Sequence, residues 1–180
     1  MIMGPIEIEE ALSTFRIIVD RREQRTPKAA ERYKSFGVPF AQATLDYGDY
    51  CADIVLPGGT HLCDISGRVS PRCVIERKMS LDELAGCFTR TRDRFRKEFE
   101  RASAAGAVVY LLVEGGSYEG IIGHRYRSKF HPEAFIASLV AWQVRYDLRL
   151  IFCKSGTSGR VIKEVLYRDV KERLERGEYG

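Results

Sequence analysis

The chain contains 180 residues, of which 44% are hydrophobic and 30% are charged. This length suffices for one domain with a full hydrophobic core, and the sequence shows no internal repeat or low-complexity segment. The formal net charge of +4 is mildly basic, which is compatible with a nucleic-acid partner but does not indicate one. No stretch approaches the roughly 18 apolar residues of a membrane span, and the N-terminus lacks a signal-peptide pattern, so we expect a cytoplasmic protein.

Residues 1–14 read as a polar-acidic lead-in, and residues 15–180 are expected to form a single domain. Apolar runs and helical periodicity predict strands near 15–20, 39–45, 50–56, 73–78, 107–114 and 148–153, and helices near 27–36, 80–99, 131–146 and 158–176. The last helix alternates Lys, Arg and Glu, which indicates a solvated outer helix. Strands separated by helices predict an α/β protein with α/β/α layering.

Five cysteines occur, and none of them pairs with another at short spacing. We therefore expect reduced, mostly buried thiols rather than a zinc site or a disulfide framework. His61 lies near Cys63, but two ligands do not make a metal site. Trp142 falls in the amphipathic helix 131–146 and is expected in the core.

The run 73–75 is an apolar strand with three charged residues at its exit: Glu76, Arg77 and Lys78. Because side chains alternate along a strand, Glu76 and Lys78 are predicted to share one side and Arg77 to point to the other. A solvated strand end is the plain alternative for these three residues. Asp49, which follows Gly48 upstream, is the natural acidic partner of Glu76.

Magnesium prefers oxygen ligands and retains several waters, so two or three carboxylates suit it. Asp49 and Glu76 are candidates to hold it, and Lys78 is placed to orient a water or offset charge in the transition state. A second acidic strand exit occurs at Asp20, which ends the apolar run 15–19 and precedes Arg22 and Glu23. The sequence therefore predicts acids at several strand ends.

These elements stand in order as Val19-Asp20-Arg21-Arg22-Glu23, Gly48-Asp49, Glu76-Arg77-Lys78 and, after three further residues, Asp82. Together they resemble the nuclease domain of the XPF-type structure-specific endonuclease family, over about residues 15–153. The resemblance implies a three-layer α/β/α restriction-endonuclease-like fold with a central mixed β-sheet. It also implies a metal-dependent endonuclease that cuts DNA at flap or fork junctions, in repair, recombination or phage DNA processing.

The resemblance also implies roles for single residues. Its catalytic set maps onto Asp20, Glu23, Asp49, Glu76, Arg77, Lys78 and Asp82. Asp49, Glu76 and Asp20 are the expected ligands of Mg²⁺, for which Mn²⁺ is expected to substitute, with Glu23 acting directly or through water. Two alternatives remain open: Asp82 opens the next helix and suits its dipole, and Arg22 is either a phosphate contact or a structural ion pair.

The helix after the motif begins with a capping-box pattern, Ser80 with Glu83, and one face carries many basic residues. Arginine offers paired donors to phosphate, so Arg90 and Arg94 are the expected DNA contacts, together with Arg22. Interleaved acids make internal pairing along the helix the alternative for part of this charge.

Residues 50–75, between Asp49 and Glu76, form a longer spacer than the family pattern suggests. Turn signals predict an extra hairpin near 57–72. Arg68 and Arg72 in this insertion either contact DNA or belong to a lengthened sheet, and we favour the lengthened sheet.

Many family members carry a helix-hairpin-helix module after the nuclease domain, and residues 154–180 leave no room for one. The chain therefore resembles a stand-alone prokaryotic or phage form, and we expect a homodimer or a separate DNA-binding partner, with no membrane association. Two other functions stay open: a Holliday-junction resolvase-like nuclease, and a non-catalytic DNA-binding scaffold of the same fold.

Overall fold

The computed structural model describes residues 3–179, so residues 1–2 of the lead-in and Gly180 of the expected domain lie outside the described part. A seven-stranded sheet with the order β4-β2-β1-β3-β5-β6-β7 forms the centre. β3 is antiparallel to both of its neighbours, β1 and β5, and the other neighbouring pairs are parallel. The strands are β1 (Arg16–Asp20), β2 (Phe40–Leu45), β3 (Tyr50–Asp53), β4 (Arg68–Val69), β5 (Cys73–Lys78), β6 (Val108–Glu114) and β7 (Arg149–Cys153).

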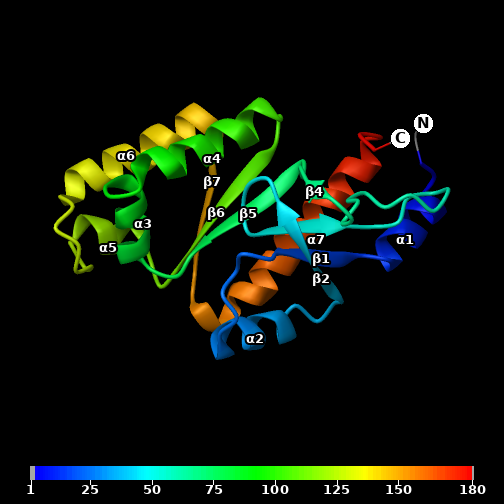
Figure 1. Cartoon of the computed structure of the whole chain (residues 1–180), viewed down its shortest axis with the longest axis horizontal. Coiled ribbons are helices and arrows are strands. Elements are labelled where there is room, and N and C mark those ends of the chain that lie inside the picture. The colour runs from blue at the N-terminus through cyan, green and yellow to red at the C-terminus, as the bar shows by residue number, and fades with distance from the viewer. Residues whose placement is uncertain (1–2, 180) are drawn as a thin grey trace.

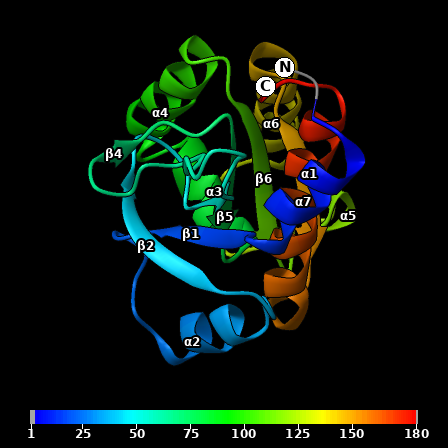
Figure 2. The same ribbon diagram turned by 90° about the vertical axis from the view of Figure 1, so that its right-hand side faces the viewer.

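Helices cover both faces of the sheet (Figure 1). One face carries α1 (Pro5–Ser13), α2 (Pro27–Lys34) and α7 (Ser158–Glu175), which follows the short 3₁₀ helix Ser155–Thr157. The other face carries α3 (Leu81–Phe88), α4 (Arg92–Ala104), α5 (Tyr118–Ile122) and α6 (Pro132–Tyr146). Figure 2 shows α1 and α7 on one side of the sheet and α4 on the other, which confirms the predicted α/β/α fold with a mixed sheet. Within the described residues, no helix is both long and apolar enough to cross a membrane.

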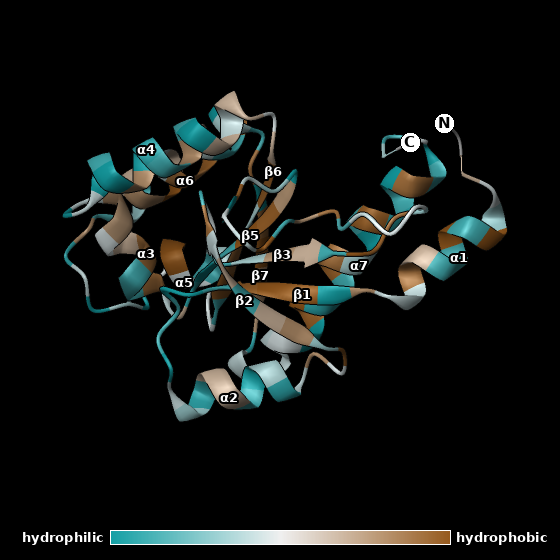
Figure 3. Cartoon of the chain, turned by 45° about the vertical axis from the view of Figure 1, so that its right-hand side comes forward, coloured by the Kyte–Doolittle hydropathy of each residue, from teal (hydrophilic) through white to brown (hydrophobic). Residues whose placement is uncertain are grey.

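Each face of the sheet has its own hydrophobic core, because strand side chains alternate. Ile18 and Val74 pack toward α3, α4 and α6, whereas Ile17 and Ile75 pack toward α1 and α7. Figure 3 shows the hydrophobic colour concentrated in central strands such as β1 and β6, and the hydrophilic colour along α4. Trp142 is 1% exposed in the first core, as predicted. The five cysteines are free, and four of them are buried.

Two terminal segments differ from the sequence-based expectation. Part of the lead-in forms α1, whose Ala11 and Leu12 are buried in the second core. The helix α7 is not a solvated outer helix, because one of its faces is buried against the sheet through Ile162, Leu166, Val170 and Leu174. These residues recur every four positions, so the alternating charges occupy only the outward face.

The expected continuous helix after the motif is interrupted at Thr89–Thr91, between α3 and α4. Thr89 leaves the helical region with φ −116° and ψ −82°. The hydroxyls of Thr89 and Thr91 donate to the carbonyls of Ala85 and Gly86, at 2.8 and 3.4 Å. Such side-chain bonds compete with the helical backbone, which allows the chain to change direction here.

In the insertion, the expected hairpin is reduced to a single antiparallel bridge between Val55 and His61 around a tight turn. The following residues form β4, which pairs in parallel with β2 at the edge of the sheet. Arg68 lies 2.7 Å from Asp46 in an ion pair rather than at the acidic strand ends. The insertion therefore lengthens the sheet, as favoured from the sequence.

Candidate active site

Three neighbouring strands, β1, β3 and β5, bring acidic residues to the same end of the sheet. The main-chain nitrogen of Asp20 donates to the carbonyl of Asp49 at 2.8 Å, and the nitrogen of Asp49 donates to the carbonyl of Ile75 at 2.8 Å. This ladder places Asp49 between Asp20 and Glu76. Residues that are far apart in the chain thus converge because their strands pair.

Gly48 sets the path of the chain into Asp49. Its φ is +72°, a region that other residues rarely adopt, and a Cβ atom there would lie 2.0 Å from Cγ2 of Val74. Only glycine permits this approach between the loop and β5. In the Gly-Asp pair, Gly48 therefore supplies the backbone geometry and Asp49 supplies the carboxylate.

Glu76 and Lys78 share one face of β5, as predicted. The Nζ atom of Lys78 donates to Oε1 of Glu76 at 2.5 Å, and the two residues are 9% and 4% exposed. The main-chain nitrogen of Arg77 donates to Oδ2 of Asp49 at 2.7 Å. These contacts hold both carboxylates and the ammonium in one group.

Burial and mutual repulsion shape the charges of this group. Burial and the nearby charge of Glu76 raise the pKa of Asp49 well above its usual value. Burial also raises the pKa of Glu76, although Lys78 opposes this effect. Burial acts to lower the pKa of Lys78, but the negative charges of Glu76 and Asp49 outweigh it and raise that pKa.

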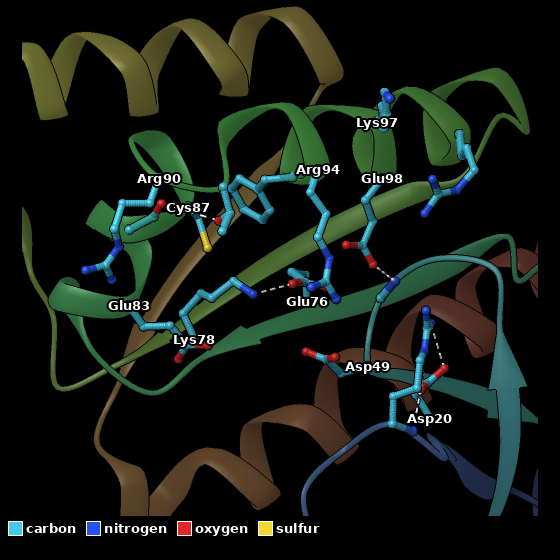
Figure 4. Close-up of a pocket in the computed structure, with 16 residues that line it drawn as sticks. Asp20, Asp49, Glu76, Lys78, Glu83, Cys87, Arg90, Arg94, Lys97 and Glu98 are labelled. Atoms are coloured by element: carbon cyan, nitrogen blue, oxygen red, sulfur yellow. Dashed lines mark hydrogen bonds and ion pairs between the residues drawn. The ribbon is translucent and has the colours of Figure 1, made fainter.

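A cleft of about 750 Å³ opens over this group (Figure 4). α3 and α4 form its basic wall, from which Arg94 extends toward Glu76. The three expected DNA contacts, Arg22, Arg90 and Arg94, all line the cleft. Lys97 and Arg101 line it as well, and their spacing of three and seven residues from Arg94 places them on the same helical face.

Asp20 lies in the cleft lining, but its oxygens are already engaged. Oδ1 accepts from the main-chain and Nε nitrogens of Arg22, at 2.7 and 2.8 Å, and Oδ2 accepts from Arg22 and from the nitrogen of Leu45. Burial acts to raise the pKa of Asp20, but the hydrogen bonds of Arg22 outweigh it and lower that pKa. Arg22 thus pairs with Asp20 and not with Glu23.

Glu23 and Arg77 point to the opposite face of the sheet. Arg77 lies 3.5 Å from Glu23 and 3.4 Å from Glu114, and Arg32 lies 3.8 and 3.4 Å from the same two acids. Tyr50 also donates its hydroxyl to Glu23, at 3.0 Å. We call Glu23, Arg32, Arg77 and Glu114 the charge quartet. The structure does not bring Glu23 and the Arg77 side chain into the cleft.

Asp82 lies in the first turn of α3, outside the cleft lining. Its Oδ1 atom accepts hydrogen bonds from the main-chain nitrogens of Arg127 and Ser128, both at 2.8 Å. Asp82 therefore holds the segment between α5 and α6. Of the seven residues that the sequence assigned to catalysis, the cleft gathers Asp20, Asp49, Glu76 and Lys78.

Glu98 on α4 is a cleft residue that the sequence interpretation assigned only to pairing along the helix. Its Oε1 atom accepts a hydrogen bond from the nitrogen of Gly48 at 3.0 Å. No local sequence signal indicates this contact, because it joins segments 50 positions apart.

The donor set suits a hydrated hard cation. Asp49 Oδ1 and Glu76 Oε2 accept no hydrogen bond from the described residues. Between residues 3 and 179, however, no three His, Cys, Asp or Glu side chains gather to hold a metal by themselves. Magnesium is often held by only one or two carboxylates while it keeps several waters, so Asp49 and Glu76 fit it.

A restriction-endonuclease-like fold whose strand ends carry two acids and a lysine in a basic cleft defines a nuclease-type domain. The chain belongs to the ERCC4 domain family, whose model matches residues 19–165, and this confirms the resemblance seen in the motifs.

Solved structures agree with this assignment. XPF from Aeropyrum pernix matches with a TM-score of 0.58 and 24% identity, over 86% of this chain and 61% of that one. XPF from Aeropyrum pernix in complex with DNA matches with a TM-score of 0.59 and 25% identity, over 88% of this chain and 66% of that one. The chain thus spans less than two thirds of either structure. No curated protein matches it.

Proposed function

We propose that this chain is a divalent-metal-dependent endonuclease that hydrolyses phosphodiester bonds in branched DNA, at flap or fork junctions. The observation that carries the proposal is the convergence of Asp49, Glu76 and Lys78 in one cleft with a basic wall. Because flaps and forks arise in repair, recombination and phage DNA processing, those are the processes it would serve.

In this mechanism, Asp49 and Glu76 would hold Mg²⁺, or Mn²⁺ in its place. The chemistry that such a metal would supply there is polarisation of the phosphoryl oxygen and activation of water. The Lys78 ammonium donates a hydrogen bond to the attacking water or to the phosphate, and the Arg77 nitrogen keeps Asp49 oriented. Asp20, whose two oxygens already accept hydrogen bonds from Arg22 and Leu45, would support the metal through water.

The α3–α4 wall binds the DNA backbone. Arg90 and Arg94, which both line the cleft, would donate to backbone phosphates. Support also comes from the similar fold of the archaeal XPF that is in complex with DNA. Part of the affinity is then electrostatic and falls as salt rises.

Cleavage of labelled flap, fork, four-way-junction and plain duplex DNA, with Mg²⁺, Mn²⁺ or EDTA, tests this function. Wild type is compared with Glu76→Gln, which keeps the side-chain shape but loses the charge, and with Glu100→Gln as a control on the exposed side of α4. We expect metal-dependent cutting of flaps or forks that only Glu76→Gln abolishes. Symmetric cutting of the four-way junction would indicate a resolvase, and binding without cutting would indicate a scaffold.

We also propose that the chain forms a homodimer through α6. Val140 and Val144 on this helix are 44% and 81% exposed, one turn apart, which leaves an exposed apolar stripe on the helix. Light scattering should show a dimer for wild type and a monomer for Val144→Glu. A wild-type monomer would instead point to a separate DNA-binding partner.

A further inference from the structure

The segment 123–131 connects α5 to α6 and is strongly basic; we call it the basic loop. It contains Arg125, Arg127 and Lys129, two histidines and no acid. None of these residues lines the cleft described above. The loop is also mostly exposed, so its charge is not explained by the core.

Hydrogen bonds hold the backbone of the loop in one conformation. Asp82 accepts from the nitrogens of Arg127 and Ser128, and the ring nitrogen Nε2 of His124 lies 2.9 Å from the carbonyl of Ser128. The Tyr126 hydroxyl donates to the carbonyl of Phe130 at 2.7 Å. Tyr126 and Phe130 also pack on the buried ring of Phe135, each with centroids 5.3 Å apart. The loop is therefore an anchored surface element.

Arg125 and Lys129 on this fixed backbone form no ion pair within the described residues, and Arg127 forms one weak contact. The Arg127 side chain is 94% exposed, and its contact with Asp82 at 3.5 Å is the only ion pair of the loop within the described residues. By contrast, Arg96 on α4 pairs with both Asp93 and Glu100. Free cations on a preordered backbone suit a polyanion, because little ordering entropy is lost when it binds.

The position of the loop favours DNA as that polyanion. Asp82, which anchors the loop, precedes Glu83; Glu83 and Gly86 of the same helix line the cleft, as does Arg90 just after that helix ends. The loop therefore lies at the start of α3, whose later turns form the cleft wall, and Figure 1 shows α3 beside α5 and α6 at this end of the molecule. A duplex that enters the cleft along α3 would meet the loop.

We propose that the basic loop is a second phosphate-binding surface, which grips a DNA arm outside the cleft, and that Asp82 is its positioning residue. The proposal rests on the proposed function, since it names the path of the same substrate. Under this proposal Asp82, the last residue of the motif, acts by holding the nitrogens of Arg127 and Ser128 and does not contact the metal. Arg125, Arg127 and Lys129 supply the phosphate contacts.

The binding test compares two triple variants that lose the same charge. Arg125→Ala/Arg127→Ala/Lys129→Ala removes the loop cations. Arg168→Ala/Lys171→Ala/Arg176→Ala removes two cations of α7 and the one that follows it; the C-terminal part of α7 lies at the opposite end of the molecule (Figure 1). Binding to fork DNA is measured by fluorescence anisotropy in EDTA at several salt concentrations, so that it does not depend on cleavage. We expect about tenfold weaker binding for the loop variant and a salt slope smaller by about two to three. Equal affinities for the two triples would overturn the proposal.

The role of Asp82 is tested with metal present, by separating kcat from KM. Asp82→Ala should raise KM for fork DNA to a similar extent as the loop triple while kcat stays within about threefold. Asp82→Asn should restore KM, because the amide oxygen accepts the same two N–H groups. A loss of kcat in Asp82→Asn would overturn the positioning role. If wild type binds and cuts DNA while the loop triple behaves like its control, only the proposal for the basic loop is contradicted. If wild type neither binds nor cuts DNA, the proposed function is contradicted, and the proposal for the basic loop falls with it.

Discussion

Glu98 on α4 accepts a hydrogen bond from the main-chain nitrogen of Gly48, and this bond ties the helical wall of the cleft to the loop that carries Asp49. Glu98 is half-buried and lines the cleft together with Gly48 and Asp49. Two hydrogen bonds therefore position Asp49: the Arg77 nitrogen donates to its carboxylate, and Glu98 accepts from the nitrogen of the preceding residue, Gly48.

Glu98→Ala is expected to lower kcat about fivefold, since the lost hydrogen bond, which is partly buried, is worth about 1 kcal/mol and its loss loosens the loop that carries Asp49. Glu98→Gln should recover most of the rate, because its amide oxygen still accepts the Gly48 N–H. Single-turnover cleavage and circular dichroism measure the two effects separately. Wild-type rates in Glu98→Ala would show that the contact is dispensable.

Gly48→Ala is expected to destabilise the fold by about 2–4 kcal/mol, because the left-handed backbone and the clash with Val74 act together. Gly37→Ala is the matched control: its φ is +66°, but a Cβ there meets nothing within 4 Å, so about 1 kcal/mol is expected. Urea unfolding of both variants compares them. Equal losses would mean that the contact with Val74 adds nothing.

Arg77→Ala should destabilise the protein by about 3–5 kcal/mol, because it leaves Glu23 and Glu114 of the charge quartet with one arginine. Removing charge from both partners, in Arg77→Met/Glu114→Gln, should cost less than the single change. Thermal and urea unfolding measure this. A stable Arg77→Ala protein that has lost only its catalytic rate would instead support the direct catalytic role expected from the motif.

The insertion should loosen in acid through Asp46. Hydrogen bonds from Ser70 and Arg68 lower the pKa of Asp46 below 3.8. A lowered folded-state pKa stabilises the protein above the unfolded value, and this contribution is lost as the pH falls through the folded value. The stability difference between wild type and Asp46→Asn should therefore be present at about pH 6, begin to shrink below about pH 4, and vanish only below the folded-state pKa. A constant difference across this range would exclude the linkage.

The sequence itself determined the layers of the fold and the core of the site. Local apolar runs marked the strands β1, β5 and β6, and period-two alternation placed Glu76 and Lys78 on one side of β5 with Arg77 on the other. These properties depend on neighbouring residues, so they can be inferred without knowing how distant segments meet.

Only the tertiary structure decided which charged groups form contacts that stabilise the fold. The engagement of Asp20 by the nitrogen of Leu45, the charge quartet on the far face, and the anchoring of residues 127–128 by Asp82 all join segments that are close only after the sheet forms. A charged side chain looks alike in sequence whether it faces a substrate or a partner, because its role is set by the groups that folding brings within a few ångströms of it.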